Sequence, residues 1–237
     1  MARVHIGKRA VQGHLESYAQ RFDMVEVRPD LDAPVRPAAL KKWRASVPAP
    51  FVFSVVLPTA VFDARNDKLA HQALDQSLEV ARLLQSPVIV IATPVSFTPT
   101  SSNRRRLAAL VAKLPDDVVR LAWEPAGLWE LEEARAIASN LKLTLVTDAA
   151  REQLPPGPIA YTRLRGLGDA RRMSSARLER VLDNLRGRRE AYVVIETDGA
   201  SHVAKALREG LQQTERARAP RPRTTAQPLL AEDEEQE

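Results

Sequence analysis

Short apolar segments rich in β-branched residues alternate with amphipathic segments along most of the chain, and this alternation strongly limits its possible folds. Eight segments have the composition of buried strands: Arg3–Gly7, Met24–Arg28, Phe51–Leu57, Val88–Thr93, Arg120–Pro125, Leu143–Asp148, Ala160–Gly166 and Ala191–Thr197. Between them, apolar residues recur at the three- and four-residue spacing of helices. Because strands that alternate with helices pair in parallel through right-handed crossovers, the sequence predicts an α/β fold, a small (β/α)8 TIM-like barrel.

The composition indicates one folded domain followed by a charged tail. With 44% hydrophobic residues among 237, the chain can form a sizeable core. After residue 214 the sequence is first basic and punctuated by proline, and then almost wholly acidic. Such a segment buries too little apolar surface to offset the entropy cost of ordering. We therefore expect a barrel domain over residues 1–214 and a disordered polyampholyte tail over residues 215–237.

The sequence also disfavours several classes of protein. No apolar run approaches the roughly 20 residues of a membrane span, and the first residues do not resemble a secretory signal, so we expect a cytoplasmic protein without a membrane partner. The absence of cysteine excludes disulfides, thiolate metal sites and a cysteine nucleophile. The net charge of +5 comes from arginines spread over many segments, which makes nucleic acid a less favoured partner without excluding it. The oligomeric state is left open.

Charged residues recur at the carboxyl ends of the predicted strands. In a βα barrel an active site lies at this end, and side chains along each strand alternate between the lumen and the helices. The alternation turns the following charged residues inward: Glu26, Arg28, Glu124, Asp148, Arg163, Arg165, Glu196 and Asp198. Because an ionised group removed from water costs several kcal/mol unless it is paired, these side chains have to meet one another or solvent.

Two interpretations of these charges remain open. The first is a pocket for a small anionic or polyhydroxy ligand, with the binding residues Arg28, Arg163, Arg165, Asp198 and Trp129. If that pocket is catalytic, the candidates for proton transfer or for holding a divalent metal are Glu26, Glu124, Asp148 and Glu196. The protein would then be a metal-assisted hydrolase, lyase or isomerase. In the second interpretation the acids and arginines neutralise one another and plug the barrel mouth. The sequence implies no specific cofactor.

Short blocks along the chain keep the order and spacing of a known family. They include the segment from Tyr18 to Val27, Glu124-Pro125, Thr147-Asp148, the segment from Tyr161 to Gly166 and the segment from Tyr192 to Asp198. Over about residues 15–207 these blocks resemble the YecE-like proteins, known as domain of unknown function 72 (DUF72). The resemblance implies a TIM-like barrel, in agreement with the periodicity, and a family whose activity is not established.

The chain departs from this family pattern at several polar positions. A lysine late in the third strand and a glutamine in the fourth are replaced by Val56 and Ala92, and a histidine in the seventh by Arg165. An arginine after the third strand is Thr59, and an asparagine pair in the eighth is Glu196-Thr197. The residues that match the pattern are Glu26, Glu124, Asp148, Arg163 and Asp198. We therefore expect a divergent, shortened member that binds a ligand or has lost turnover.

Overall fold

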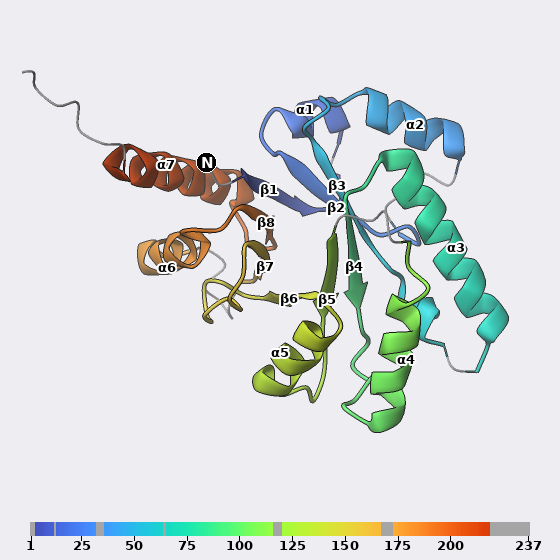
Figure 1. The fold of residues 1–237 in the computed structure, drawn as a ribbon. Coiled ribbons are helices and arrows are strands. Elements are labelled where there is room, and N and C mark those ends of the chain that lie inside the picture. Colours follow the sequence, from blue (N-terminus) through green and yellow to red (C-terminus); the bar gives the residue numbers. More distant parts are fainter. Residues whose placement is uncertain are drawn as a thin grey trace, which may run out of the picture.

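Eight parallel strands close into the barrel that the alternation predicts. A computed structural model describes residues 3–11, 13–31, 36–63, 65–115, 120–166 and 173–218. The strands follow one another around the barrel in sequence order (Figure 1): β1 (Arg3–Arg9), β2 (Met24–Val27), β3 (Val52–Val56), β4 (Val88–Ala92), β5 (Arg120–Glu124), β6 (Thr144–Thr147), β7 (Ile159–Leu164) and β8 (Glu190–Ile195). Since β8 pairs with β1, the described sheet is closed and has a TIM-like topology.

Helices surround the strands on the outside of the barrel (Figure 1). They are α1 (Leu15–Ala19), α2 (Pro37–Ala45), the 3-10 helix η1 (Thr59–Phe62), α3 (Asp67–Leu84), α4 (Ser101–Val111), α5 (Leu131–Asn140), α6 (Ser175–Leu185) and α7 (Ala200–Arg218). The connection from β6 to β7, residues 148–158, forms turns and contains no helix, which corrects the expected eightfold alternation. Its prolines at 155, 156 and 158 provide no backbone N–H and disfavour helical backbone in the residue before them.

The last helix extends past the predicted end of the folded domain. We placed that boundary at residue 214, but α7 continues to Arg218. The rest of the predicted tail, residues 219–237, lies outside the described residues, so its disorder stays a prediction. In the described part of the chain, no helix is both long and apolar enough to cross a membrane.

Side chains of the strands alternate between two apolar cores. The inner core fills the lumen and consists of Met24, Val52, Val56, Val88, Val90, Ala122, Val146, Tyr161, Tyr192 and Val194. The outer core lies on the helix side and includes Val25, Val27, Trp123 and Leu145. These two sets face the sides that the period-two alternation predicts. Because side chains fill the lumen, a site has to lie at one of its ends.

Polar side chains close the amino-terminal end of the lumen. The ring of His5 stacks on that of Tyr192 with centroids 5.3 Å apart, and its Nε2 lies 3.8 Å from the carboxylate of Glu190. Arg120 donates a hydrogen bond of 3.0 Å to the other oxygen of Glu190. Burial lowers the pKa of His5 below its ordinary value of 6.5, although the charge of Glu190 opposes this shift. His5 is therefore neutral in the folded protein near neutral pH.

The stability of the protein should fall as the pH drops below 6.5. A lowered folded-state pKa means that the unfolded chain binds the proton on His5 more readily, so this contribution is complete above pH 6.5 and is lost as the pH falls through the folded-state pKa. The slope from one proton is at most about 1.4 kcal/mol per pH unit. Urea denaturation at several pH values measures the free energy of unfolding. This free energy should depend less on pH in His5→Phe, which keeps an aromatic ring on Tyr192. The exposed His202→Phe is the control with the wild-type slope, and an unchanged slope in His5→Phe would contradict this prediction.

Gly7 allows β1 and β2 to approach closely. A Cβ atom at this position would overlap the backbone oxygen of Met24 and lie 2.6 Å from its carbonyl carbon and 2.7 Å from its Cγ. Gly7 and Met24 are paired in the β1–β2 ladder, so the backbone cannot move aside without opening the sheet. Any larger residue at position 7 therefore disturbs the barrel wall and the lumen together.

Gly7→Ala should lower the free energy of unfolding by about 1–3 kcal/mol, the usual cost of overpacking a core. Gly210→Ala is the matched control, since its Cβ atom would meet only the flexible side chain of Leu182. Alanine also favours the helical backbone of α7 by up to about 1 kcal/mol. Chemical denaturation should give Gly210→Ala a clearly higher free energy of unfolding than Gly7→Ala. Equal stability of the two variants would refute the close approach of β1 and β2.

Candidate functional site

An ion cluster centred on Arg163 of β7 occupies the carboxyl-terminal end of the lumen. The two Nη atoms of Arg163 each donate a hydrogen bond of 2.8 Å to Glu26. In addition, Nη2 lies 2.9 Å from a carboxylate oxygen of Glu124, and Nη1 lies 2.8 Å from one of Glu196. Arg163 is 4% exposed and Glu26 only 1%. Burial alone would lower the pKa of Arg163, but the charges of the surrounding groups, Glu26 first among them, outweigh it and raise this pKa, so the guanidinium stays charged.

Tyr161 completes the hydrogen bonding of Glu26. It lies two residues before Arg163 on β7 and therefore faces the same side of the strand. Its hydroxyl donates a hydrogen bond of 2.7 Å to Glu26 and lies 3.0 Å from Oγ of Ser54. Burial raises the pKa of Tyr161 well above its ordinary value, and the charge of Glu26 adds to the shift, so the hydroxyl keeps its proton. Glu26 thus accepts bonds from both neighbours, which compensates for its removal from water.

Two further arginines lie above this cluster. Arg165 is 50% exposed, forms an ion pair with Glu124 and lies 3.5 Å from Glu196. Arg9, from the end of β1, is 45% exposed and lies 3.7 Å from Glu196. The mouth therefore has a buried guanidinium below and two accessible ones above.

These charges line a hollow of about 270 Å³ at the mouth of the barrel. Its walls come from the strand ends and are formed by Arg9, Glu26, Arg28, Val56, Leu57, Thr59, Ala92, Thr93, Glu124, Arg163, Arg165 and Glu196. The volume is close to the lower end of the range of about 300–1,000 Å³ that is usual for ligand pockets. We call this hollow the mouth pocket.

The comparison with protein families agrees with the motifs of the sequence. The model of a family described as protein of unknown function DUF72 matches residues 7–228. The chain belongs to the DUF72 family. The predicted resemblance is therefore confirmed, and the family description supplies no activity for the mouth pocket.

Solved structures share the fold of this DUF72 barrel. A DUF72 family protein from Enterococcus faecalis matches with a TM-score of 0.68 and 14% identity, covering 90% of this chain and 98% of that one. A DUF72 family protein from Thermotoga maritima matches with a TM-score of 0.64 and 15% identity, covering 90% and 99%. A xylose isomerase domain containing protein from Salmonella typhimurium matches with a TM-score of 0.60 and 11% identity, covering 88% of this chain and 96% of that one. At these identities the likeness shows the fold alone. No curated protein matches the chain by sequence.

The mouth pocket contains both matching and departing positions of the DUF72 pattern. Glu26, Glu124 and Arg163 match the pattern and form the ion cluster. The positions that depart from it in the same lining are Val56, Thr59, Ala92, Arg165 and Glu196. The structure thus brings together two groups of residues that the sequence comparison identified separately.

Asp148 lies next to the mouth pocket but does not line it. The residue is 8% exposed and follows the last residue of β6. One carboxylate oxygen accepts a hydrogen bond of 2.9 Å from the backbone N–H of Ala150, and the other accepts one of 3.2 Å from that of Arg165. The Nε of Arg151 lies 3.3 Å from the second oxygen. Asp148 therefore holds the turn after β6 and the start of the loop after β7.

Two other predicted binding residues also lie outside the lining. Trp129 donates a hydrogen bond of 2.6 Å to the carbonyl of Phe97 and packs edge-on against Trp123, with centroids 5.1 Å apart. Its contacts are thus those of a packing residue between two loops. Asp198 is exposed in the turn after β8. Arg28, by contrast, does line the mouth pocket, and its Nη2 donates a hydrogen bond of 3.4 Å to Asp30.

The acids of the DUF72 mouth surround a guanidinium. Glu26, Glu124 and Glu196 each contact Arg163, which occupies the position between them. Over the described residues, no group of three or more His, Asp or Glu side chains is arranged to hold a metal ion. The geometry therefore gives no support to the divalent-metal alternative.

Arg9 is a pocket residue that the sequence analysis missed. The first strand was predicted to end at Gly7, whereas β1 continues to Arg9. Its side chain shares the inward side with Gly7 and His5, because residues two apart on a strand face the same way. Its backbone position pairs with Glu26 of β2, and extending the alternation by one step would have identified it.

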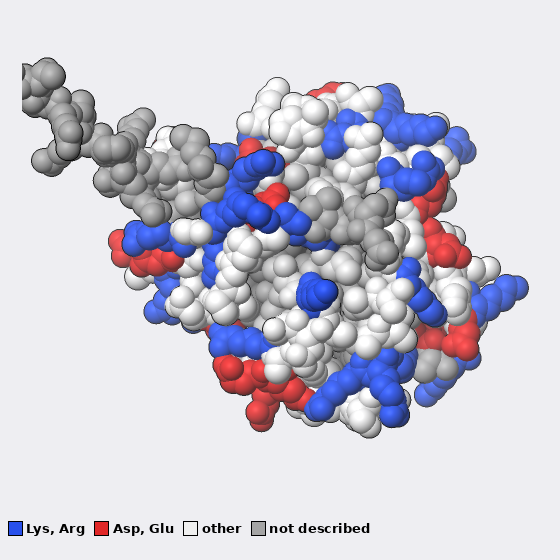
Figure 2. All heavy atoms as spheres, in the orientation of Figure 1, with Lys and Arg blue, Asp and Glu red and all other residues white. Residues whose placement is uncertain are grey.

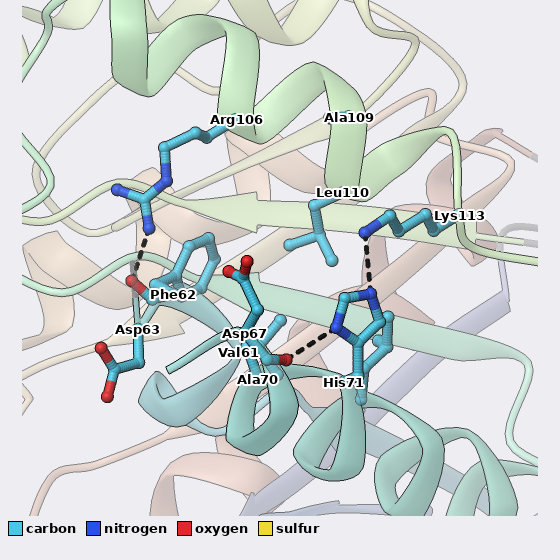
Figure 3. A pocket seen from close by; sticks show the side chains of 11 residues that line it. Val61, Phe62, Asp63, Asp67, Ala70, His71, Arg106, Ala109, Leu110 and Lys113 are labelled. Carbon is cyan, nitrogen blue, oxygen red and sulfur yellow. Dashed lines mark hydrogen bonds between the residues drawn. The ribbon is translucent and has the colours of Figure 1, made fainter. Parts of the chain in front are cut away.

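A second hollow of about 230 Å³ lies outside the barrel between α3 and α4 (Figure 3). Arg106 donates a hydrogen bond of 2.6 Å to the carbonyl of Phe62. The ring of His71 lies between the carbonyl of Asp67, at 2.6 Å, and the ammonium of Lys113, at 3.3 Å. Since a carbonyl only accepts and an ammonium only donates, these contacts fit a neutral His71 with its proton on Nδ1. The bonds join α4 to η1, and the turn after α4 to α3, across the hollow, which indicates a packing role.

Several basic side chains on the described surface pair with acids. Arg104 pairs with Glu133, and Arg208 lies 2.8 Å from Asp23. On the face drawn in Figure 2, basic and acidic side chains are interspersed around the edge, and uncharged side chains occupy much of the centre. Because nucleic-acid sites need clustered positive charge, this face does not favour the nucleic-acid alternative.

Arg163→Met should be among the most destabilising changes at the mouth. It leaves Glu26 charged and buried without its cation, a loss of about 3–5 kcal/mol in the free energy of unfolding. Adding Glu26→Gln should restore part of this loss, because the remaining buried group is then neutral. The control Arg165→Met removes a half-exposed arginine and should cost no more than about 1 kcal/mol. Denaturant titration measures all three, and a double variant no more stable than Arg163→Met would argue against the buried pair.

Proposed function

We propose that this DUF72 barrel binds a small anion, with a carboxylate or phosphate group, in the mouth pocket. The supporting observation is the charge of the lining. Four guanidinium groups, from Arg9, Arg28, Arg163 and Arg165, face three carboxylates, from Glu26, Glu124 and Glu196. The lining therefore holds one more arginine than acids, and one of these arginines, Arg28, also pairs with Asp30 outside the lining.

The buried and the exposed arginines of the lining have different roles. Arg163 contacts all three carboxylates and neutralises much of their charge from below. Arg9 and Arg165 are about half exposed, so their guanidinium groups are accessible to a ligand. Exposed ion pairs contribute only about 0–1 kcal/mol, so exchanging a contact with Glu196 for one with a ligand is inexpensive. Guanidinium groups match carboxylates and phosphates through paired N–H bonds.

Binding has more support than acid–base catalysis. The carboxylate oxygens of Glu26 and Glu124 each contact a guanidinium or the hydroxyl of Tyr161. Both oxygens of Glu196 also lie within ion-pair distance of arginines. Because their oxygens are occupied by these contacts, the three carboxylates are poorly placed to reach an atom of a bound ligand. The proposal is therefore a binding protein without turnover at these acids.

A neutral polyhydroxy ligand has less support than an anion. The hydroxyl groups in the lining come from Thr59 and Thr93, against seven charged side chains. A neutral ligand would have to displace water from those charges without replacing its interactions. A negative group can replace the carboxylate contacts of the accessible Arg9 and Arg165, which a neutral hydroxyl cannot do as well.

Inorganic phosphate and small carboxylates should stabilise the protein against heat. A ligand at 100 times its dissociation constant adds about 2.7 kcal/mol to the free energy of unfolding. Arg165→Gln should weaken binding by about 10- to 100-fold, which corresponds to one charged hydrogen-bond partner. Glu196→Gln should strengthen binding, because it removes a competitor for Arg9 and Arg165. Calorimetry measures the affinities.

The control for this experiment is Arg151→Gln, which removes an arginine outside the lining that pairs with Asp148. It should leave anion affinity unchanged. Stabilisation by neutral polyols and not by anions, or equal effects of Arg151→Gln and Arg165→Gln, would overturn the proposed function.

A further inference from the structure

We propose that the anion bound in the mouth pocket carries an apolar group, and that this group lies on the loops that follow β4 and β5. The inference rests on the proposed function, since it names the class of ligand for the same site. The ligands that fit are carboxylates or phosphate monoesters with an aliphatic or aromatic extension.

Exposed apolar side chains gather at one end of the barrel. The large ones among the described residues are Leu31, Leu69, Val95 and Leu128, which are 66%, 43%, 70% and 76% exposed. Leu31, Val95 and Leu128 lie on loops that follow β2, β4 and β5, and therefore at the carboxyl-terminal end. Single exposed apolar residues are ordinary, but their accumulation around a pocket is typical of a binding surface.

The mouth pocket itself has an apolar wall on the same side. Val56 and Leu57 at the end of β3 and Ala92 at the end of β4 line it without polar side-chain groups. The charged lining residues lie on or directly after β1, β2, β5, β7 and β8. A ligand in this pocket therefore meets charged groups over most of the lining and, at the ends of β3 and β4, these aliphatic side chains together with the hydroxyls of Thr59 and Thr93.

Val95 and Leu128 lie on the loops that leave the mouth pocket at the ends of β4 and β5. Thr93, two residues before Val95, and Glu124, four residues before Leu128, both line the mouth pocket. The two loops are in close contact, because a Cβ atom at Gly127 would lie 2.6 Å from the carbonyl oxygen of Val95. Gly127 has a φ of +85°, which a residue with a side chain rarely adopts. The loops thus form one surface that continues the pocket, which we call the apolar rim.

Neighbouring contacts hold the mouth loops in place. The hydrogen bond from Trp129 to the carbonyl of Phe97 ties the loop after β5 to the loop after β4. On another side of the mouth, the backbone N–H of Leu31 donates a hydrogen bond of 3.1 Å to the carbonyl of Arg28, which places Leu31 one turn from a lining arginine. A surface fixed before binding loses little entropy when a ligand covers it.

The size of the pocket explains why the ligand would reach the rim. A hollow of about 270 Å³ holds a head group and a few further atoms, so a larger ligand has to extend outward. An apolar extension is stabilised by covering Val95 and Leu128, whereas a charged extension would lose water there without gaining a partner.

The experiment compares ligands that share a head group and differ in chain length. Calorimetry would use inorganic phosphate, a series of straight-chain alkyl phosphates and the carboxylates from acetate to octanoate. Affinity should rise by about three- to fourfold for each methylene group that the rim covers. The phosphate and carboxylate series distinguish the two possible head groups. Arg165→Gln should weaken every member of the preferred series by the same factor.

Variants of the rim test the chain-length effect separately from head-group binding. Val95→Ser and Leu128→Ser should flatten the dependence on chain length and leave the affinity for inorganic phosphate unchanged. Leu69→Ser is the matched control, because Leu69 is an exposed leucine on α3 rather than on these loops. It should preserve both the dependence on chain length and the affinity for inorganic phosphate.

The possible failures are distinguishable. Phosphate binding that depends on Arg165 without any effect of chain length would overturn the apolar extension and leave the proposed function intact. Long-chain ligands whose binding ignores Arg165→Gln would show that the rim and the pocket are separate, which also overturns it. A dimer in sedimentation that Leu128→Ser dissociates would mean that a second copy covers the rim. If no anion binds at all, the proposed function fails and this inference fails with it.

Discussion

The buried contact between Arg163 and Glu26 links β7 to β2, two strands that are not neighbours in the barrel, and the arrangement of the mouth depends on it. A pair that is 4% and 1% exposed is tolerated only when its hydrogen bonds are satisfied, because desolvation of both charges otherwise exceeds their attraction. Tyr161 and the two more exposed acids occupy Glu26 and both Nη atoms of Arg163, whereas the buried Nε of Arg163 has no hydrogen-bond partner among the described residues. All three carboxylates thus surround the guanidinium of Arg163, and two of them also contact the more accessible Arg9 and Arg165.

The same side chains connect the two ends of the lumen. Tyr161 stacks on Tyr192 with centroids 5.8 Å apart, and Tyr192 stacks on His5 at 5.3 Å. This column of rings runs from the acid at the mouth to the acid at the opposite end, Glu190. Small and β-branched residues fill the remaining space, so the lumen is a packed core and not a channel. The packed column lies directly below the ion cluster and supports Glu26 through the hydroxyl of Tyr161.

The fold and the inward side of each strand could be predicted from the sequence, because both follow from periodicity. Contacts among the inward residues could not, since they depend on strand ends and on tertiary geometry. Asp148 follows the end of β6 and binds backbone N–H groups of two loops instead of entering the pocket. Arg9 was missed for the opposite reason, because β1 runs two residues further than predicted. The missing helix after β6 reflects local proline chemistry that overrides the βα alternation.

The positions at which the chain departs from the family pattern lie on particular sides of the mouth pocket. Val56 and Ala92, where the pattern has a lysine and a glutamine, lie on neighbouring strands and line the mouth pocket with aliphatic groups. Arg165, in place of a histidine, lies on the charged side. If the pocket had merely lost its function, polar groups would have no reason to disappear from one wall while a guanidinium is added to the other. A pocket with charge on one side and hydrocarbon on the other instead selects a ligand built in the same way. If the pocket binds the anion proposed above, these differences from the family pattern fit a change of ligand.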